Sequence, residues 1–297
     1  MTERFYRSLA GLSRYVGLWI VGVTAAVVAT GYFVLLPRRL GHSVRFYRAL
    51  FPERSAFHAF LCAWRQYQDF AALYRERLEI ERRSDVNIES GGERKLAQAK
   101  AAGRGAILVM SHFGRWEIGA RLLARRQEGV TLVMGGMAGG GARAGVDQDL
   151  RSAGLDVRTV SAGQGQAFDI LQAGQVLRAG GMVSLAADRA YGEARMLRLP
   201  FLGHVVSVAA APFALALASG APLLVVFAVK IGRRHYRLIC DDPITLTALD
   251  RGDRPKVMEK AALAYLQRLH DMMKAYPEQW QTFGEFLRRD RRPQGEL

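Results

Sequence analysis

The run from Val16 to Leu36 contains no charged residue and is rich in valine, alanine and leucine. As a helix rising about 1.5 Å per residue it would be about 31 Å long, enough to cross the hydrocarbon core of a bilayer. Pro37 and two arginines end it sharply, without the small-residue cleavage site of a signal peptide. We therefore expect an N-terminal membrane-anchoring helix. A helix that lies in the membrane surface, or enters and leaves on one side, is the alternative.

Basic residues flank this run on both sides and are more numerous after it. They are Arg4, Arg7 and Arg14 before the run and Arg38, Arg39, Arg45, Arg48 and Arg54 after it. Because basic residues collect on the cytoplasmic side of membrane helices, the asymmetry places the rest of the chain in the cytoplasm. We divide the chain into residues 1–45, a basic N-terminus with the anchor, and residues 46–297, an α/β domain.

Net charge is the outlying property of the composition. The 297 residues suffice for one large domain, and 42 Lys and Arg against 27 Asp and Glu give a formal net charge of +15. Such an excess indicates an anionic partner, namely phospholipid headgroups, a phosphorylated lipid, an acidic protein or nucleic acid. An arginine-rich genome would also favour Arg over Lys. The arginines are scattered and no zinc-finger or RNA-binding signature occurs, which argues against a membrane-tethered nucleic-acid-binding module.

Cysteine and glycine patterns limit the cofactor classes. Cys62 and Cys240 are far apart and lack metal-ligand spacing, which predicts a reducing compartment and no metal site. The glycine-rich stretch 135–141 lacks the spacing of a dinucleotide fingerprint, and no P-loop motif occurs. We interpret this stretch as a mobile loop before a helix on which Arg143 and Arg151 are candidate anion contacts.

Short apolar runs alternate with amphipathic stretches from residue 93 onward, the pattern of an α/β domain. The expected strands are 106–110, 130–134, 156–161, 182–187, 222–229 and 235–240. The expected helices are 93–102, 115–126, 166–178, 206–219 and 255–276, after an amphipathic helix over 46–83. We predict a mixed sheet flanked by helices.

One strand leads directly into a histidine. His112 follows the expected strand 106–110, and Glu117 falls in the first turn of the next helix. Ligands of open α/β sheets bind at the carboxyl ends of the strands. Residues five apart diverge by about 140° on one straight helix, but a strand–turn–helix junction lets the imidazole and the carboxylate meet. The pair predicts a general base and its orienting group. Asp188 and Arg189 emerge from another strand in the same manner.

Several ordered blocks carry a family resemblance. His112-Phe-Gly-Arg-Trp-Glu117 looks like a His-x4-Asp/Glu box, and four further blocks follow it in order. They are Asp188-Arg-Ala-Tyr-Gly192, Leu199-Pro-Phe-Leu-Gly203, Gly220-Ala-Pro-Leu-Leu-Val-Val226 and Tyr276-Pro-Glu-Gln-Trp280. With these blocks the chain resembles the lipid A late acyltransferases (lauroyl and myristoyl transferases) of the lysophospholipid acyltransferase superfamily. Arg115 departs from that pattern, which usually has Asn, and the Phe-Pro-Glu-Gly-Thr-Arg block of glycerophosphate-type relatives is absent.

The resemblance implies an enzyme on the cytoplasmic face of the bacterial inner membrane. It would move a fatty acyl chain from an acyl thioester, on acyl carrier protein or coenzyme A, to a hydroxyl of a lipid A precursor or similar anionic glycolipid. His112 would be the base and Glu117 would hold its ring, with no cofactor beyond the thioester. Backbone N–H groups near Gly114, or Arg115 or Arg189, would stabilise the oxyanion.

Other residues are implied to bind substrate. The full set is Gly114, Arg115, Arg143, Asp188, Arg189, Tyr191, Pro200, Phe201 and Gly203. Because Arg115 puts a charge beside the proposed base, it signals a different donor or acceptor. Alternative acceptors are an ornithine-type lipid, a polyene-linked lipid and a lysophospholipid. A catalytically silent scaffold is a further alternative, against which the intact pair of His112 and Glu117 argues.

Overall fold

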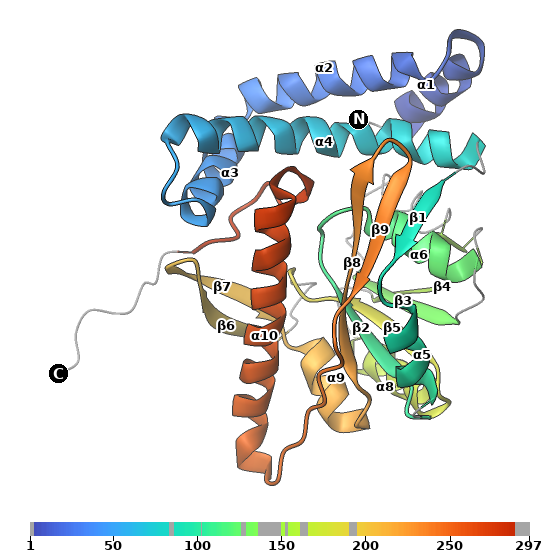
Figure 1. Ribbon diagram of the computed structural model, residues 1–297, viewed down its shortest axis with the longest axis vertical. Coiled ribbons are helices and arrows are strands. Elements are labelled where there is room, and N and C mark those ends of the chain that lie inside the picture. Colours follow the sequence, from blue (N-terminus) through green and yellow to red (C-terminus); the bar gives the residue numbers. More distant parts are fainter. Residues whose placement is uncertain are drawn as a thin grey trace, which may run out of the picture.

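A seven-stranded sheet of order β1-β9-β8-β2-β5-β3-β4 forms the centre of the computed structural model (Figure 1). The structure describes residues 3–82, 86–101, 103–125, 129–135, 150–151, 154–160, 166–189 and 195–288. The strands are β1 (Asn87–Ser90), β2 (Ala106–Met110), β3 (Val130–Gly135), β4 (Asp156–Val160), β5 (Met182–Ala186), β8 (Leu223–Gly232) and β9 (His235–Cys240), with β6 (Met196–Phe201) and β7 (His204–Ala209) in a separate hairpin. All neighbours in the large sheet are parallel except β8 and β9, which confirms the predicted mixed sheet.

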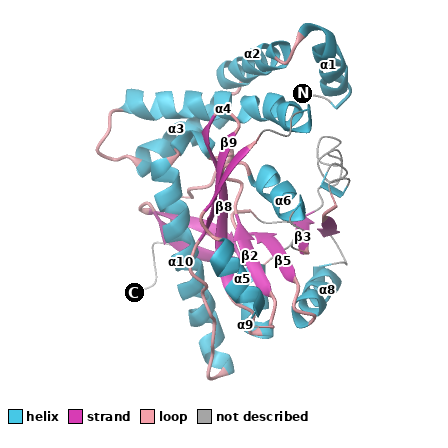
Figure 2. Cartoon of the chain, turned by 45° about the vertical axis from the view of Figure 1, so that its right-hand side comes forward, coloured by secondary structure: helices cyan, strands magenta, loops and turns pink. Residues whose placement is uncertain are grey.

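Helices cover both faces of this sheet. They are α5 (Glu93–Ala101), α6 (Trp116–Arg125), α8 (Gln166–Arg178), α9 (Ala211–Ser219) and α10 (Arg254–Ala275). Because side chains alternate along a strand, Ile107 and Val109 of β2 pack in the core shared with α8, α9 and α10. Ala106 and Leu108 pack on the opposite face with α5 and α6. Figure 2 shows α10 and α6 on either side of β8.

The N-terminal helices form a layer of their own. They are α1 (Glu3–Val16), α2 (Trp19–Leu35), α3 (Pro37–Leu50) and α4 (Ala56–Arg82), and α2 runs alongside α4 at the top of Figure 1. The buried residues of α2 recur at every fourth position, which lines them up on one face. They are Val21, Ala25, Ala29 and Phe33. The Phe33 ring makes edge-on contacts with Phe60, Trp64 and Tyr67 of α4, so protein occupies one face of α2.

The predicted anchor over residues 16–36 differs from the observed helix. The run breaks at Gly17, which has a φ of +103° and separates α1 from α2. Within the described ranges, no single helix is long and apolar enough to cross a membrane, and α2 and α3 pass that test only as a pair bent by 91°. The outward face of α2 is nevertheless apolar and exposed, with Trp19, Val23, Val27, Val34 and Leu35.

Two predicted helices were placed wrongly. The helix expected over 46–83 is divided, because α3 ends at Leu50 and α4 begins after a turn. The helix expected over 206–219 is also shorter, since its first residues belong to β7, where buried Val206 and Val208 alternate with less buried neighbours. The hairpin turns at Leu202 and Gly203, whose φ values of 50° and 69° match a turn that needs two left-handed residues.

Phe33→Ala should lower the free energy of unfolding by about 3–5 kcal/mol, because it leaves a cavity between α2 and α4. Denaturant unfolding of the full-length protein in detergent measures the change. Val27→Ala is the matched control on the exposed face of the same helix and should change that free energy by less than about 0.5 kcal/mol. Equal effects of the two substitutions would contradict the packing of α2 on α4.

Candidate active site

His112 and Asp188 lie side by side at the carboxyl ends of neighbouring strands. β2 pairs with β5 in a register that sets Met110 opposite Ala186, so both residues follow the last pair by the same short distance along the chain. His112 Nδ1 is 3.0 and 3.1 Å from the two carboxylate oxygens of Asp188. The Asp188 side chain is fully buried, whereas the imidazole keeps 15% of its surface exposed. The imidazole therefore reaches solvent while its partner is shielded.

The environment keeps Asp188 ionised. Burial alone would raise the pKa of this carboxyl, but the charge and hydrogen bonds of His112 and the charge of Arg189 outweigh it and lower the pKa below its ordinary value. An ionised carboxylate accepts hydrogen bonds only, so it favours the tautomer in which Nδ1 carries the proton. That tautomer leaves the lone pair of Nε2 available to a substrate proton.

Glu117 has a different partner. It stands in the first turn of α6, and its carboxylate forms an ion pair with Arg77 of α4. Asp188 thus occupies the position at Nδ1 that the sequence suggested for Glu117. The role of Glu117 in orienting the imidazole stays a prediction.

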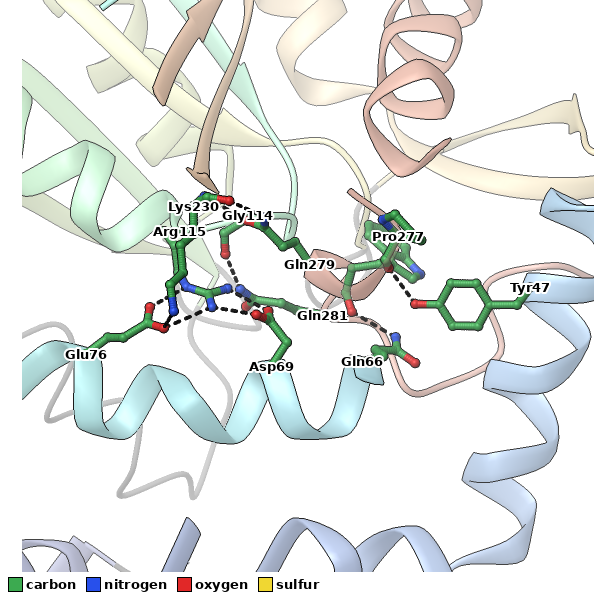
Figure 3. A network of polar contacts seen from close by, with 11 residues as sticks. Tyr47, Gln66, Asp69, Glu76, Gly114, Arg115, Lys230, Pro277, Gln279 and Gln281 are labelled. Carbon is green, nitrogen blue, oxygen red and sulfur yellow. Dashed lines mark hydrogen bonds and ion pairs between the residues drawn. The ribbon is translucent and has the colours of Figure 1, made fainter. Parts of the chain in front are cut away.

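Arg115 is buried in a network with α4 (Figure 3). Its guanidinium donates to Asp69 at 2.7 and 2.8 Å and to Glu76 at 2.6 and 3.3 Å. Lys230 Nζ lies 2.5 Å from Glu76, and we call these four residues the Arg115 network. Burial lowers the pKa of Arg115, but the hydrogen bonds and charges of Asp69 and Glu76 raise it above the ordinary value. Two carboxylates occupy its fully shielded guanidinium, an arrangement that favours a structural role. That Arg115 binds substrate or stabilises the oxyanion stays a prediction.

The loop after His112 is held by the C-terminal segment. The Gly114 N–H donates to the Gln279 carbonyl at 2.9 Å, and the Arg115 N–H donates to a carbonyl of β8 at 2.5 Å. The Gln281 N–H donates to the His112 carbonyl at 2.9 Å, and its side-chain amide donates to the Gly114 carbonyl. The N–H groups of Gly114 and Arg115 are therefore already paired, which does not favour these two as oxyanion donors. That backbone N–H groups near Gly114 stabilise an oxyanion stays a prediction.

Gly114 is required by the shape of the backbone. Its φ of +70° lies in the left-handed region, and a Cβ on this residue would overlap the carbonyl oxygen of Ala228. That oxygen is the one that accepts the Arg115 N–H. The glycine thus lets the loop approach β8 closely enough to form this hydrogen bond.

A cavity of about 540 Å³ lies beside Asp188 and Arg189. It is lined by Arg39, Asp188, Arg189, Met196, Ser207, Thr282, Phe283, Gly284, Glu285, Phe286 and Arg288. Arg189 donates to the Gln281 carbonyl at 2.8 Å. Glu285 pairs at 3.9 Å with Arg45, which does not line the cavity. The arginines outnumber the carboxylates in these walls, so the cavity suits an anionic group.

The sequence profile described as bacterial lipid A biosynthesis acyltransferase matches residues 49–289. The chain belongs to this family. The matched range contains both strand ends, the loop after His112 and the hairpin, so the family predicted from the ordered blocks is confirmed. A search of the curated proteins found no match to this acyltransferase.

The other predicted binding residues of the acyltransferase fall in several places. Pro200 pairs with Val205 within the hairpin, Gly203 forms its turn, and Phe201 packs on Phe286. These three are not among the residues that line the cavity, to which the hairpin contributes Met196 and Ser207 instead. Arg143 and Tyr191 lie outside the described residues, and Arg151 is exposed.

Several residues that hold the site were missed from the sequence. Asp69 and Glu76 are two turns apart on α4 and therefore share a face, a signal that the sequence contained. No feature of the sequence indicated that Arg115 is the partner of these two carboxylates. The side-chain amide of Gln279 accepts from the backbone N–H of Lys230 at 2.9 Å and donates to its carbonyl at 2.8 Å. About fifty residues of chain separate the two. In the described part of this acyltransferase, no three His, Cys, Asp or Glu side chains are grouped to hold a metal ion.

Arg115→Ala should lower the free energy of unfolding by about 3–5 kcal/mol, because it strands two carboxylates without their cation. Denaturant unfolding followed by circular dichroism measures the loss. Arg233→Ala is the control. The Arg233 side chain is 79% exposed, and its ion pair with Glu79 is long, with 3.8 Å between the nitrogen and the oxygen. It should cost less than about 1 kcal/mol. A loss that small in Arg115→Ala would contradict a structural role for the network.

Stability should also fall in acid through Glu76. Burial alone would raise its pKa, but Arg115 and Lys230 lower it below the ordinary 4.5. Because the folded protein binds this proton less tightly than the unfolded chain, Glu76 stabilises the fold above about pH 4.5, and the contribution is lost as the pH falls through the lowered pKa. Unfolding free energies measured from about pH 7 to about pH 3 should fall less steeply for Glu76→Gln than for the wild type. Equal slopes would contradict this assignment.

Proposed function

We propose that the protein transfers a fatty acyl chain from an acyl thioester to a hydroxyl group of a lipid A precursor or similar anionic glycolipid. The observation that carries this proposal is the hydrogen bond between His112 Nδ1 and the buried Asp188 carboxylate beside a cationic cavity. Family membership supports acyltransferase activity. An imidazole held in this tautomer supplies the base that a hydroxyl acceptor needs.

His112 is the general base in this proposal. Nε2 takes the proton of the acceptor hydroxyl while the hydroxyl oxygen attacks the carbonyl carbon of the thioester. The tetrahedral intermediate then expels the thiolate, which recovers the proton from the imidazolium, so an ester and a free thiol are formed without an acyl-enzyme. Asp188 lies 3.0 Å from Nδ1 and stabilises the imidazolium as it forms.

The cationic cavity is the proposed acceptor site. Arg39, Arg189 and Arg288 line it, and guanidinium groups bind phosphate through two parallel hydrogen bonds. Arg189 follows Asp188 directly, so we also assign to it the stabilisation of the oxyanion. Its hydrogen bonds to Gln281 and Thr282, at 2.8 and 3.2 Å, hold the guanidinium in place.

We propose acyl carrier protein as the donor, with coenzyme A thioesters as the alternative. The formal charge of +15 is complementary to an acidic carrier protein and would steer the encounter. The same charge favours the headgroups of an anionic membrane.

The proposed membrane contact is the outward face of α2, with this layer on the cytoplasmic face of the bacterial inner membrane. Trp19, Val23, Val27 and Val34 are exposed along it. Arg38 and Arg39 follow at the start of α3, where basic side chains meet lipid phosphates. Because α4 covers the other face of α2, we propose that the helix lies in the membrane surface rather than crossing it.

His112→Ala should lower kcat/KM by about 10²- to 10⁴-fold while the protein stays folded. Asp188→Asn should cost a similar factor, mainly in kcat, because an amide does not stabilise the imidazolium. Steady-state rates with an acyl-carrier-protein thioester measure both, and unfolding curves check the fold. Glu117→Gln is the comparison and should lose less activity than Asp188→Asn. Wild-type turnover by His112→Ala would overturn the mechanism, and a greater loss in Glu117→Gln would return the orienting role to that residue.

The acceptor class needs a separate assay. Purified protein should acylate a lipid A precursor in preference to an ornithine lipid, a polyene-linked lipid and a lysophospholipid, because the precursor offers phosphates to the arginines of the cavity. Mass spectrometry of the products identifies each acylated lipid. A lysophospholipid product without a lipid A product would overturn the proposed acceptor while leaving the acyl transfer intact.

A further inference from the structure

A second cavity, of about 250 Å³, lies between α2 and α4. Small side chains of α2 form one wall, including Ala25 and Val28, and aromatic rings of α4 form the other, including Phe70. Most of its surface is carbon. A ligand enclosed there would have to be apolar and narrow.

This second cavity adjoins the active site. Arg39 and Phe283 line both it and the cationic cavity, which also contains Asp188 and Arg189. Phe283 follows residues 279–281, which hold the loop after His112. The centroids of the Phe283 and Phe70 rings are 5.2 Å apart. A molecule with a polar reacting end and a long apolar tail would therefore find polar walls near His112 and apolar walls beyond Phe283.

We infer that the cavity between α2 and α4 binds the distal part of the fatty acyl chain of the thioester donor, and that the packing of these two helices sets the acyl chain length. This inference rests on the proposed acyl transfer. Each buried methylene group improves binding about fourfold, so a cavity of fixed depth selects among chain lengths. A chain longer than the space would have to displace α2 from α4, where Phe33 is packed between aromatic rings.

Adjacent valines on α2 provide a matched test. Val28 is half-buried and lines the cavity, whereas Val27 is 65% exposed on the outward face and does not line it. Val28→Trp fills the cavity, Val28→Ala enlarges it, and Val27→Trp adds the same bulk outside it. Unfolding curves of the full-length proteins confirm that each variant is folded.

The readout is the ratio of kcat/KM for myristoyl and decanoyl thioesters of acyl carrier protein. Val28→Trp should lower this ratio at least about tenfold by excluding the longer chain, and Val28→Ala should shift the preference toward longer chains. Val27→Trp changes the proposed membrane-contact face, so any effect on activity should be the same for both thioesters and leave their ratio unchanged. Equal losses for both chain lengths in Val28→Trp, or an unchanged ratio in both Val28 variants, would overturn the inference.

A binding arm separates this inference from the proposed function. In a His112→Ala background, myristoyl thioester should bind more weakly after Val28→Trp than after Val27→Trp. If the wild-type protein turns over no thioester but this difference in binding is present, the proposed reaction fails and the chain site stands. If turnover is normal but neither binding nor chain-length preference responds, the chain site fails and the reaction stands.

Discussion

The ion pairs of Arg115 with Asp69 and Glu76 join the loop after β2 to the long helix α4. A buried guanidinium without partners would be far more costly than the pairs themselves, so α4 must lie across this loop for the fold to be stable. Through its other contacts α4 also carries α2 and α3. One cation therefore links the position of the N-terminal layer to the position of His112, three residues earlier in the chain.

The same loop is fixed from a second direction. Residues 279–281 donate to it and accept from it through backbone and side-chain groups, and the Trp280 backbone bridges to Phe113. A base whose loop is held from two directions loses little entropy when the substrate arrives, which is how positioning accelerates a reaction. The consequence is that the N–H groups of Gly114 and Arg115 and the carbonyls of His112 and Gly114 already have hydrogen-bond partners within the protein. In the proposed reaction, charge stabilisation is assigned to the Arg189 side chain.

The sequence predicted the parts of this site better than their pairing. Apolar runs identified β2 and β5 and showed that His112 and Asp188 end them, because buried strands are contiguous and apolar. Which strands are neighbours depends on long-range packing, so the contact of His112 with Asp188 was not predicted. The same limit explains Arg115, whose partners are some forty residues away on α4. The hairpin at β7 was missed because valines that alternate in burial look like a continuous apolar run. The packing of α2 on α4 was not predicted, because apolarity does not distinguish lipid from protein as the neighbour of a helix.

The left-handed backbone at Gly114 shows that the segment from His112 to Glu117 is constrained by its backbone conformation as well as by its proposed chemistry. His112 contributes a reacting atom, whereas Gly114 contributes the direction in which the chain leaves β2. That direction depends on a carbonyl of β8, a strand that lies more than one hundred residues later. Transplanting the histidine and its carboxylate onto another sheet would therefore not transplant the centre. The smallest unit that would keep this geometry is β2, the turn after it, and β8, whose carbonyl accepts the hydrogen bond from the turn.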